Sequence, residues 1–331
     1  MSQKIAWIDN LRALACMMVV MIHASTFQVV NFATINSLSW QLADVLNAFS
    51  RAAVPVFFMI SGYLFWGEKS ARPRHFLRIA LCWFFYSALA VFYLYVSTKM
   101  GFWPLLKNIL QKPVFYHLWF FYAIGVIYLL SPFIAIKKVS APLLVIVAIL
   151  LGVLANPQLP ALNWQGFHLL PLNLYITGDA FYYLLYALFG RALGILDYDK
   201  PWLGWAAATT FVASSLLIAI GTELQSQHNQ NFASTYYFYC SPLVFIAALS
   251  LFLWARQALA RLDWPPLRLI SRHSLAIYGF HALIIIALRS GHLDFPRSPL
   301  LNIAWLFICG LLGGLLLALL LSRVDGKRWV S

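Results

Sequence analysis

The chain has 331 residues, of which 62% are hydrophobic and only 10% are charged. Soluble domains carry about 25% charged residues, so this composition excludes a soluble globular protein and indicates a polytopic integral membrane protein. The formal net charge of +13 does not point to a nucleic-acid partner, because Lys and Arg collect in the cytoplasmic loops of membrane proteins. The four cysteines all fall in apolar segments without metal-ligand spacing, so we expect no metal site.

About ten apolar segments reach or approach the length that crosses a bilayer. No soluble block separates them, so we expect an all-α bundle that forms one membrane domain over residues 1–331. The predicted spans lie at residues 5–27, 46–66, 76–97, 117–136, 139–155, 173–196, 202–220, 235–256, 268–289 and 299–322.

The basic residues of the connecting loops set the orientation. With the N-terminus inside, sixteen of the 23 Lys and Arg residues fall in inner segments and five in outer segments. This bias predicts that both termini are cytoplasmic.

The first predicted span carries three ionisable side chains, Asp9, Arg12 and His23. Such groups are costly in a membrane helix and usually face a partner or a cavity. Eleven residues separate Arg12 from His23, which is about 16 Å of helical rise and just over three full turns. Both side chains, with Asp9 three residues earlier, therefore share one helix face and are expected to open on one shared cavity. The alternative is a structural ion pair and a packed histidine.

The second predicted span descends from the outer side, contains Arg51 near its start and ends near the cytoplasm with Ser61, Gly62 and Tyr63. Small residues such as Gly62 also serve close helix packing, which is the structural alternative. The basic loop that follows leads into Arg74 and Arg78. It is either an orientation signal or a phosphate-binding surface at the cytoplasmic mouth.

Further polar groups cluster at the outer depth. His117 opens the fourth span beside Trp119, which an aromatic belt would also explain. His281 lies thirteen residues above the base of the ninth span, about 20 Å of rise, and follows Tyr278. Three imidazoles from different helices are thus expected at one depth. Asp179 is one of two acidic residues placed clearly inside a span, and a structural pairing is its alternative.

These positions suggest base-catalysed acyl transfer. A neutral imidazole can take a proton from an alcohol, which then attacks an activated acyl group. A donor with a polyanionic head and a thin reactive arm would join the basic inner mouth to the outer histidine. Coenzyme A has that shape: its phosphates would lie near Arg12, Arg74 and Arg78 while its thioester reaches toward His23.

Several stretches resemble the acyltransferase-3 family of bacterial membrane-bound acyltransferases. The resemblance spans nearly the whole chain, and the order, the spacing and the number of helices agree. It is carried by Asp9-Asn10-Leu11-Arg12-Ala13 followed by His23, by residues 51–63, by Ser274-Leu275-Ala276-Ile277-Tyr278-Gly279-Phe280-His281, and less specifically by His117-Leu118-Trp119-Phe120.

The resemblance implies transfer of an acetyl group from acetyl-CoA to a hydroxyl of an extracytoplasmic or lipid-linked glycan. It implies a multi-pass protein of the bacterial cytoplasmic (inner) membrane, in contact with membrane lipid. Catalytic positions would be His23, Arg12 and Asp179, the last in place of a glutamate that some members carry in the middle helices. Donor-binding positions would be Arg12, Ser61, Gly62, Tyr63, Arg74 and Arg78, and acceptor-binding positions Arg51, His117, Trp119, Tyr278 and His281.

Two other classes stay open at this point. A transporter or flippase for a glycolipid or small metabolite would also use buried charges, although no inverted repeat is evident. A polyprenyl-phosphate-dependent glycosyltransferase would be expected to carry acids in the first outer loop, where residues 30–44 contain only Asp44. The sequence leaves open the acceptor sugar, an acyl-histidine intermediate and the oligomeric state.

Overall fold

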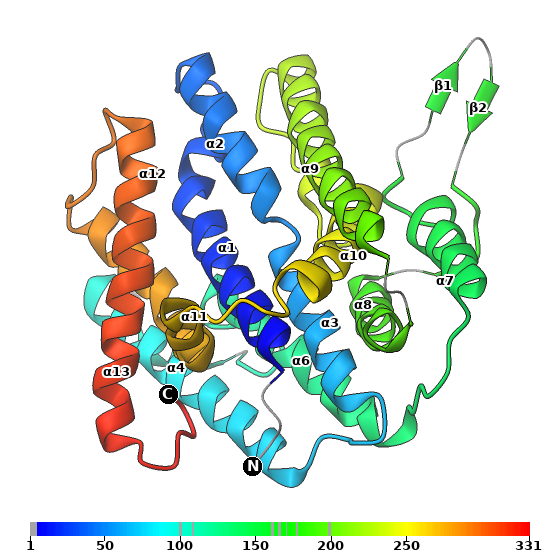
Figure 1. The fold of residues 1–331 in the computed structure, drawn as a ribbon. Helices are drawn as coiled ribbons and strands as arrows, with labels where there is room; N and C mark the ends of the chain where they lie inside the picture. The colour runs from blue at the N-terminus through cyan, green and yellow to red at the C-terminus, as the bar shows by residue number, and fades with distance from the viewer. Residues whose placement is uncertain are drawn as a thin grey trace.

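The computed structural model describes residues 5–98, 101–107, 109–159, 162–164, 167–169, 171–176, 178–197 and 200–331. It is a helical bundle (Figure 1). The α-helices are α1 (Ala6–Val30), α2 (Ser37–Ser50), α3 (Ala53–Phe65), α4 (Pro73–Ser97), α5 (Phe102–Leu106), α6 (Trp119–Leu130), α7 (Ala141–Val147), α8 (Asp179–Ile195), α9 (Pro201–Asn229), α10 (Pro242–Ala258), α11 (Pro265–Ser290), α12 (Pro299–Ile308) and α13 (Gly314–Val324).

Shorter elements complete this architecture. π-Helical turns extend α7 through Ala148–Leu154 and join α12 to α13 through Cys309–Gly313. Short 3₁₀ turns precede or follow the helices at Tyr116–Leu118, Ser131–Phe133 and Thr235–Tyr237. β1 (Leu162–Trp164) and β2 (Phe167–Leu169) pair as antiparallel strands.

Eight helical stretches of the described chain are long and apolar enough to cross a membrane. The all-α, multi-pass class predicted from the sequence is therefore confirmed. Two of the ten predicted spans are shorter helices: Ala141–Leu154, and α8 with 17 residues. Both termini lie toward the same end of the bundle (Figure 1), as an even number of crossings requires.

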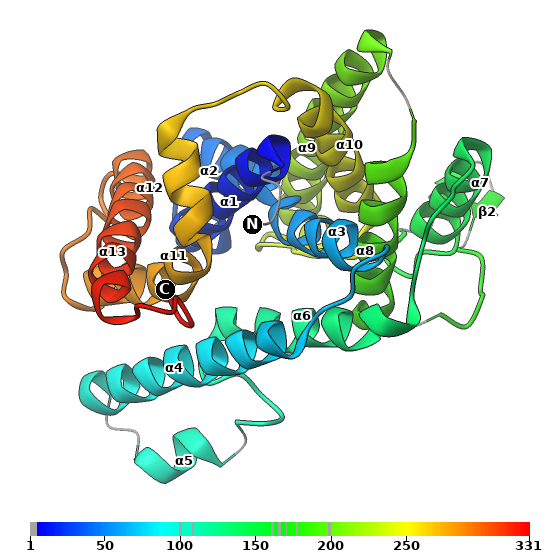
Figure 2. The ribbon, with the colours of Figure 1, turned by 60° about the horizontal axis from the view of Figure 1, so that its bottom comes forward.

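Helix α1 lies at the centre of the bundle and contacts α2, α3, α10, α11 and α12 (Figure 1). Apolar side chains along its length are buried, as expected for a helix surrounded by others. Helices α4 and α6 run side by side along one edge of the bundle, with α5 outside them (Figure 2). This arrangement leaves α4 and α6 facing α1, α3 and α11 across the region that holds the site.

The second predicted span differs from the structure. Instead of one helix from residue 46, α2 begins at Ser37, where the side chain of Asn36 accepts the backbone N–H of Ser39. The chain then turns at Arg51 before α3 begins. Pro55 explains this break, because it has no N–H to donate to the Arg51 carbonyl one turn earlier. The break sets Arg51 at a helix junction instead of within a continuous span.

Helix α9 extends nine residues beyond the predicted end of its span. The segment expected to be an outer loop, residues 221–229, is helical, and several of its polar residues pack against the rest of the bundle. Thr222 and Ser226 are buried, and the Gln41 side chain of α2 donates to Glu223 Oε1 at 2.6 Å. The polar composition of residues 221–229 therefore belongs to a packed helix end and not to the loop that was expected.

Two glycines let α3 and α8 touch backbone to backbone. A Cβ on Gly62 would lie 1.9 Å from the Ala187 carbonyl oxygen, and a Cβ on Gly190 would lie 2.0 Å from that of Met59. Close approach through small residues is typical of membrane helix pairs. The α3–α8 contact in turn fixes the cavity-facing side of α3.

We predict that Gly62→Ala destabilises the protein, because the new methyl group would push α8 away from α3. The expected loss of unfolding free energy is about 1–3 kcal/mol, the range for overpacked sites. Thermal unfolding in detergent measures it. Gly125→Ala in α6 is the matched control, since a Cβ there meets nothing within 4 Å. Equal unfolding temperatures for the two variants would contradict the packing role.

Candidate active site

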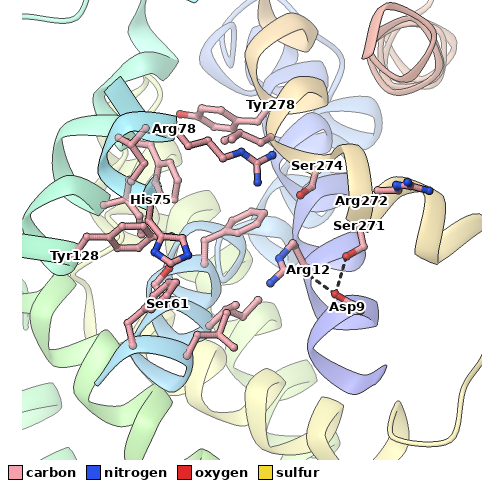
Figure 3. Close-up of a pocket in the computed structure, with 18 of the residues that line it drawn as sticks. Asp9, Arg12, Ser61, His75, Arg78, Tyr128, Ser271, Arg272, Ser274 and Tyr278 are labelled. Carbon is pink, nitrogen blue, oxygen red and sulfur yellow. Dashed lines mark hydrogen bonds and ion pairs between the residues drawn. The ribbon is translucent and has the colours of Figure 1, made fainter. Parts of the chain in front are cut away.

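A cavity of about 860 Å³ lies between α1, α3 and α11 on one side and α4 and α6 on the other (Figure 3). Its charged end lies where α1 and α11 begin, beside Asp9, Arg12 and Arg268. Its inner walls are apolar and aromatic, with Phe120 and Tyr278 among them. A long ligand with a charged head and a slender tail matches this distribution of side chains.

Four guanidinium groups line this cavity against one carboxylate. The arginines are Arg12, Arg78, Arg268 and Arg272, and the acid is Asp9. Figure 3 shows Arg12 entering from α1 and Arg78 from α4, with Arg272 turned away from both. Clustered guanidinium groups bind phosphates by bidentate hydrogen bonds, so this end of the cavity suits a polyanion.

Asp9 orients Arg12. Arg12 Nη1 donates to Asp9 Oδ1 at 2.8 Å, and Ser271 Oγ of α11 donates to the same oxygen at 3.4 Å (Figure 3). Asp9 thus ties α1 to α11 and fixes the direction of the Arg12 guanidinium. The pairing predicted from the three-residue spacing is present.

The C-terminal segment packs against α4, which carries the cavity residue Arg78. Arg78 Nη2 donates to the Ser331 carbonyl oxygen at 3.1 Å. Asp325 accepts the backbone N–H groups of Trp329, Val330 and Ser331 at 2.8–2.9 Å. Burial alone would raise the pKa of Asp325, but these donors hold the pKa below its ordinary value. The hydrogen bonds to ionised Asp325 stabilise the folded protein fully above pH about 3.9, the ordinary pKa of an aspartate in the unfolded chain. This stabilisation is lost as the pH falls through the lower pKa of Asp325 in the folded protein.

Three histidines form a contiguous cluster beyond the inner end of the cavity. The ring centroids of His23 and His281 are 5.1 Å apart, and those of His281 and His117 are 5.4 Å apart. The ring of Tyr116 also contacts His23, with the ring centroids 5.0 Å apart. The predicted meeting of imidazoles from three helices is therefore confirmed.

The cluster has unfilled hydrogen-bonding capacity. His281 Nδ1 lies 3.1 Å from the Ile277 carbonyl oxygen, which can only accept, so Nδ1 carries the proton and Nε2 is the acceptor. His281 Nε2 and both ring nitrogens of His117 are buried, and within the described chain none has a hydrogen-bond partner. Buried polar groups are normally paired, so these nitrogens are available to a ligand or to water.

Tyr278 separates the cavity from the histidines. It lines the cavity, its hydroxyl donates to the His117 carbonyl oxygen, and its ring lies 5.7 Å from that of His281. Arg12 lines the cavity but His23 does not, so the shared cavity expected from their common helix face is not present in this structure. The common helix face of Arg12 and His23 was predicted correctly. Tyr278, which lies between the cavity and the histidines, belongs to α11, so the pattern of α1 alone could not predict its position.

The predicted donor residues divide into two groups. Arg12, Ser61 and Arg78 line the cavity. The other three do not: Gly62 packs on α8, Tyr63 packs on Gly194 and Trp7, and Arg74 is exposed outside the lining. The prediction missed His75, Tyr128, Arg268 and Arg272, of which the last two stand one helical turn apart and offered a readable signal.

A second cavity of about 280 Å³ brings two predicted site residues together. Arg51 and Asp179 both line it, although they lie 128 positions apart in the sequence. Thr26, one turn beyond His23 on α1, lines it too. Trp119 borders it indirectly, because its ring contacts Tyr183 and Tyr239 at 5.4 and 5.8 Å. His23 is not among the lining residues of this cavity either.

Comparison with known proteins identifies the class. The family described as "Acyltransferase domain" (acyltransferase-3) matches residues 5–323. The chain belongs to this family, and it is therefore an enzyme that transfers acyl groups. Membership decides against the transporter and glycosyltransferase alternatives.

Two further comparisons add little about the reaction. A protein from Enterococcus faecalis named amino-acid racemase is 26% identical over 366 aligned positions. The match covers all of this chain but 48% of that protein, so the chain spans about half the length of this relative. No solved structure matched the chain.

We predict that Arg268→Gln weakens binding of a polyanionic acyl donor about tenfold, because one charged hydrogen-bonding group is lost from the polyanion end of the cavity. Coenzyme A serves as the probe. The dissociation constant, measured by calorimetry on purified protein in detergent, tests this. Arg261→Gln removes an exposed charge near the same end of the bundle, outside the cavity lining, and serves as the control. An equal effect of both substitutions would mean that only the general surface charge matters.

Proposed function

We propose that the protein moves an acetyl group from cytoplasmic acetyl-CoA to a hydroxyl of a cell-surface polysaccharide or of its lipid-linked precursor. The single observation that carries this proposal is the polarity of α1. Its N-terminal end contributes Arg12 to a positively charged cavity, and eleven residues further along the same helix His23 belongs to the imidazole cluster. We place the protein in the bacterial inner membrane with both termini cytoplasmic.

The donor fits the large cavity by charge and by length. The phosphates of coenzyme A would contact Arg12, Arg78 and Arg268, and the pantetheine arm would follow the apolar walls toward Tyr278. The rise from Arg12 to His23, about 16 Å, sets the distance the arm has to cover. Ser61, at the middle of the cavity wall on α3, would bind an amide of the arm.

His23 would act as the general base. The acceptor hydroxyl gives its proton to a ring nitrogen of His23, and its oxygen attacks the thioester carbonyl carbon. The C–S bond then breaks, the acetyl group stays on the acceptor oxygen, and the coenzyme A sulfur takes up the proton from His23. In the other course, acetyl first passes to His23 as a covalent acyl-imidazole and then to the acceptor.

Tyr278 controls access in this proposal. Its ring would turn away from His117 so that the thioester can reach the histidines. Side-chain rotation of this kind requires the hydroxyl to leave the His117 carbonyl, and the bound pantetheine arm would replace the contacts that the ring loses. The two compartments would thus join only when donor is present.

For the acceptor, the sequence resemblance favours a surface glycan of the enterobacterial common antigen type. Loss of acetyl groups from that glycan in a deletion strain, seen by mass spectrometry, would support the assignment. Loss of acetyl groups from a different glycan would change the proposed acceptor but would leave the proposed reaction, acetyl transfer, unchanged. The racemase name of the longer Enterococcus faecalis relative gives no support for racemisation by this chain, because this chain matches about half of that protein.

We predict that His23→Gln lowers acetyl transfer by about 10²–10⁴-fold, the usual contribution of a general base. Membranes containing the variant would be incubated with radiolabelled acetyl-CoA and the extracted lipid-linked glycan. Binding of acetyl-CoA should persist, because His23 lies outside the donor cavity. His228→Gln, at the exposed end of α9, is the matched control and should transfer acetyl normally. Unaltered transfer by His23→Gln would overturn the role of His23.

A further inference from the structure

The second cavity has the composition of a sugar-binding site. We infer that it holds one neutral, hydroxylated sugar ring of the acceptor and presents that ring to His23. This inference rests on the proposed acetyl transfer but concerns a different part of the molecule from the donor cavity. With about 280 Å³, the cavity is close to the lower limit of about 300 Å³ for small-molecule sites, so it suits a single ring and not an oligosaccharide.

Aromatic rings form much of its wall. They offer flat apolar faces on which the C–H side of a sugar ring can lie, with phenol groups at their edges. These residues come from α8 and from the segment that leads into α10, and they are Tyr183, Phe232, Tyr237, Phe238 and Tyr239. Phe238 remains 47% exposed, so an unfilled stacking surface is open to a ligand that enters from outside.

Arg51 supplies a cation that has no direct ion pair among the described residues; Asp44, which acts on it electrostatically, accepts the Tyr237 hydroxyl instead. Its guanidinium lies over the Tyr237 ring at 3.8 Å and donates from Nη2 to Asn47 Oδ1 and from Nη1 to the Tyr237 carbonyl oxygen. Among the described residues no carboxylate lies within ion-pair distance of Arg51, and its buried Nε has no acceptor. The Tyr237 ring and Asn47 hold the Arg51 guanidinium in place, and its Nε–H remains able to donate to a ligand.

Asp179 supplies the matching acceptor. It is the first residue of α8, where the exposed backbone N–H groups stabilise a carboxylate. Tyr183 donates its hydroxyl to Asp179 Oδ2 at 3.4 Å, and Cys240 lies 3.3 Å from Oδ1. Within the described ranges no Lys, Arg or His forms an ion pair with it. An exposed carboxylate so placed can accept hydrogen bonds from two vicinal hydroxyl groups.

The balance of charges selects the kind of ligand. The lining contains one cation, Arg51, and one anion, Asp179. An acidic sugar would meet Asp179 and an amino sugar would meet Arg51, so each would face a like charge. A neutral ring satisfies both, because hydroxyl groups accept from the guanidinium and donate to the carboxylate.

The position of the cavity fits delivery to the catalytic histidine. Thr26 lies three residues after His23 on α1, so the two side chains are neighbours on that helix. Two residues that line this cavity, Tyr183 and Tyr239, also contact the ring of Trp119. A ring stacked there would present a hydroxyl at the outer side of the imidazole cluster, opposite the donor cavity.

Asp179→Asn tests the inference. The substitution keeps the size of the side chain but removes its charge, and we expect the KM for the acceptor to rise about tenfold or more. Binding of acetyl-CoA, measured by calorimetry, should keep the wild-type affinity because Asp179 does not line the donor cavity, and this binding also shows that the variant is folded. Asp197→Asn, just beyond the other end of α8, is the matched control with an unchanged KM.

A set of methyl glycosides tests the ligand class. Methyl glucoside, methyl glucuronide and methyl glucosaminide would be compared as competitors of acetyl transfer. The neutral glycoside should compete best with wild-type protein and should lose that advantage with Asp179→Asn. Stronger competition by the glucuronide or the glucosaminide would overturn the neutral-ring assignment, and an unchanged KM in Asp179→Asn would overturn the location. A wild-type protein that transfers no acetyl to any acceptor would instead overturn the proposed function.

Discussion

The continuity of α1 is the constraint on which the site depends. An uninterrupted helix from Ala6 to Val30 fixes the separation of Arg12 and His23 and keeps them on one face. The ion pair of Arg12 with Asp9, shared with Ser271, locks that helix against α11, which carries Tyr278 and His281. Because both halves of the site are built on these two helices, a shift of one against the other would misplace the proposed donor site and the proposed base together.

The surroundings of α1 are arranged to keep this pair rigid. Gly62 and Gly190 let α3 and α8 meet at their backbones, and α3 in turn packs against α1. The C-terminal segment, held by Asp325, meets Arg78 on α4. Charged groups around the donor cavity are therefore anchored from several helices, which suits a site that has to hold a polyanion at a fixed distance from its chemistry.

The sequence predicted what depends on local periodicity and missed what depends on packing between distant segments. The register of Arg12 and His23 and the meeting of three histidines followed from helix geometry alone. The turn at Arg51 followed from Pro55 but was read as part of a span. The closure by Tyr278 depends on the packing of α11 against α6, which no single helix pattern contains.

The donor side of the site shows the same division. Arg12 and Arg78 were predicted because a short basic loop and a charged helix face stand out in an apolar chain. Gly62 and Tyr63 were assigned to the donor together with Ser61 from the family resemblance, yet on a helix neighbouring residues point about 100° apart. Only Ser61 faces the cavity, while Gly62 faces α8. Helical periodicity, applied to α3 as it was to α1, would have predicted that Ser61 and Gly62 face different directions.

The separation of the two cavities has a chemical rationale. A thioester that stood open to water on both sides of the membrane would be exposed to hydrolysis, and an open passage would also leak protons. In the described structure Phe120 and Tyr278 lie between the charged cavity and the histidines, and their rings are 5.4 Å apart. Removal of water from around a reacting group also strengthens the electrostatic interactions that stabilise developing charge. A wall of movable aromatic rings therefore serves acyl transfer better than a permanent tunnel, since it lets the acyl group pass while it keeps the two aqueous sides apart.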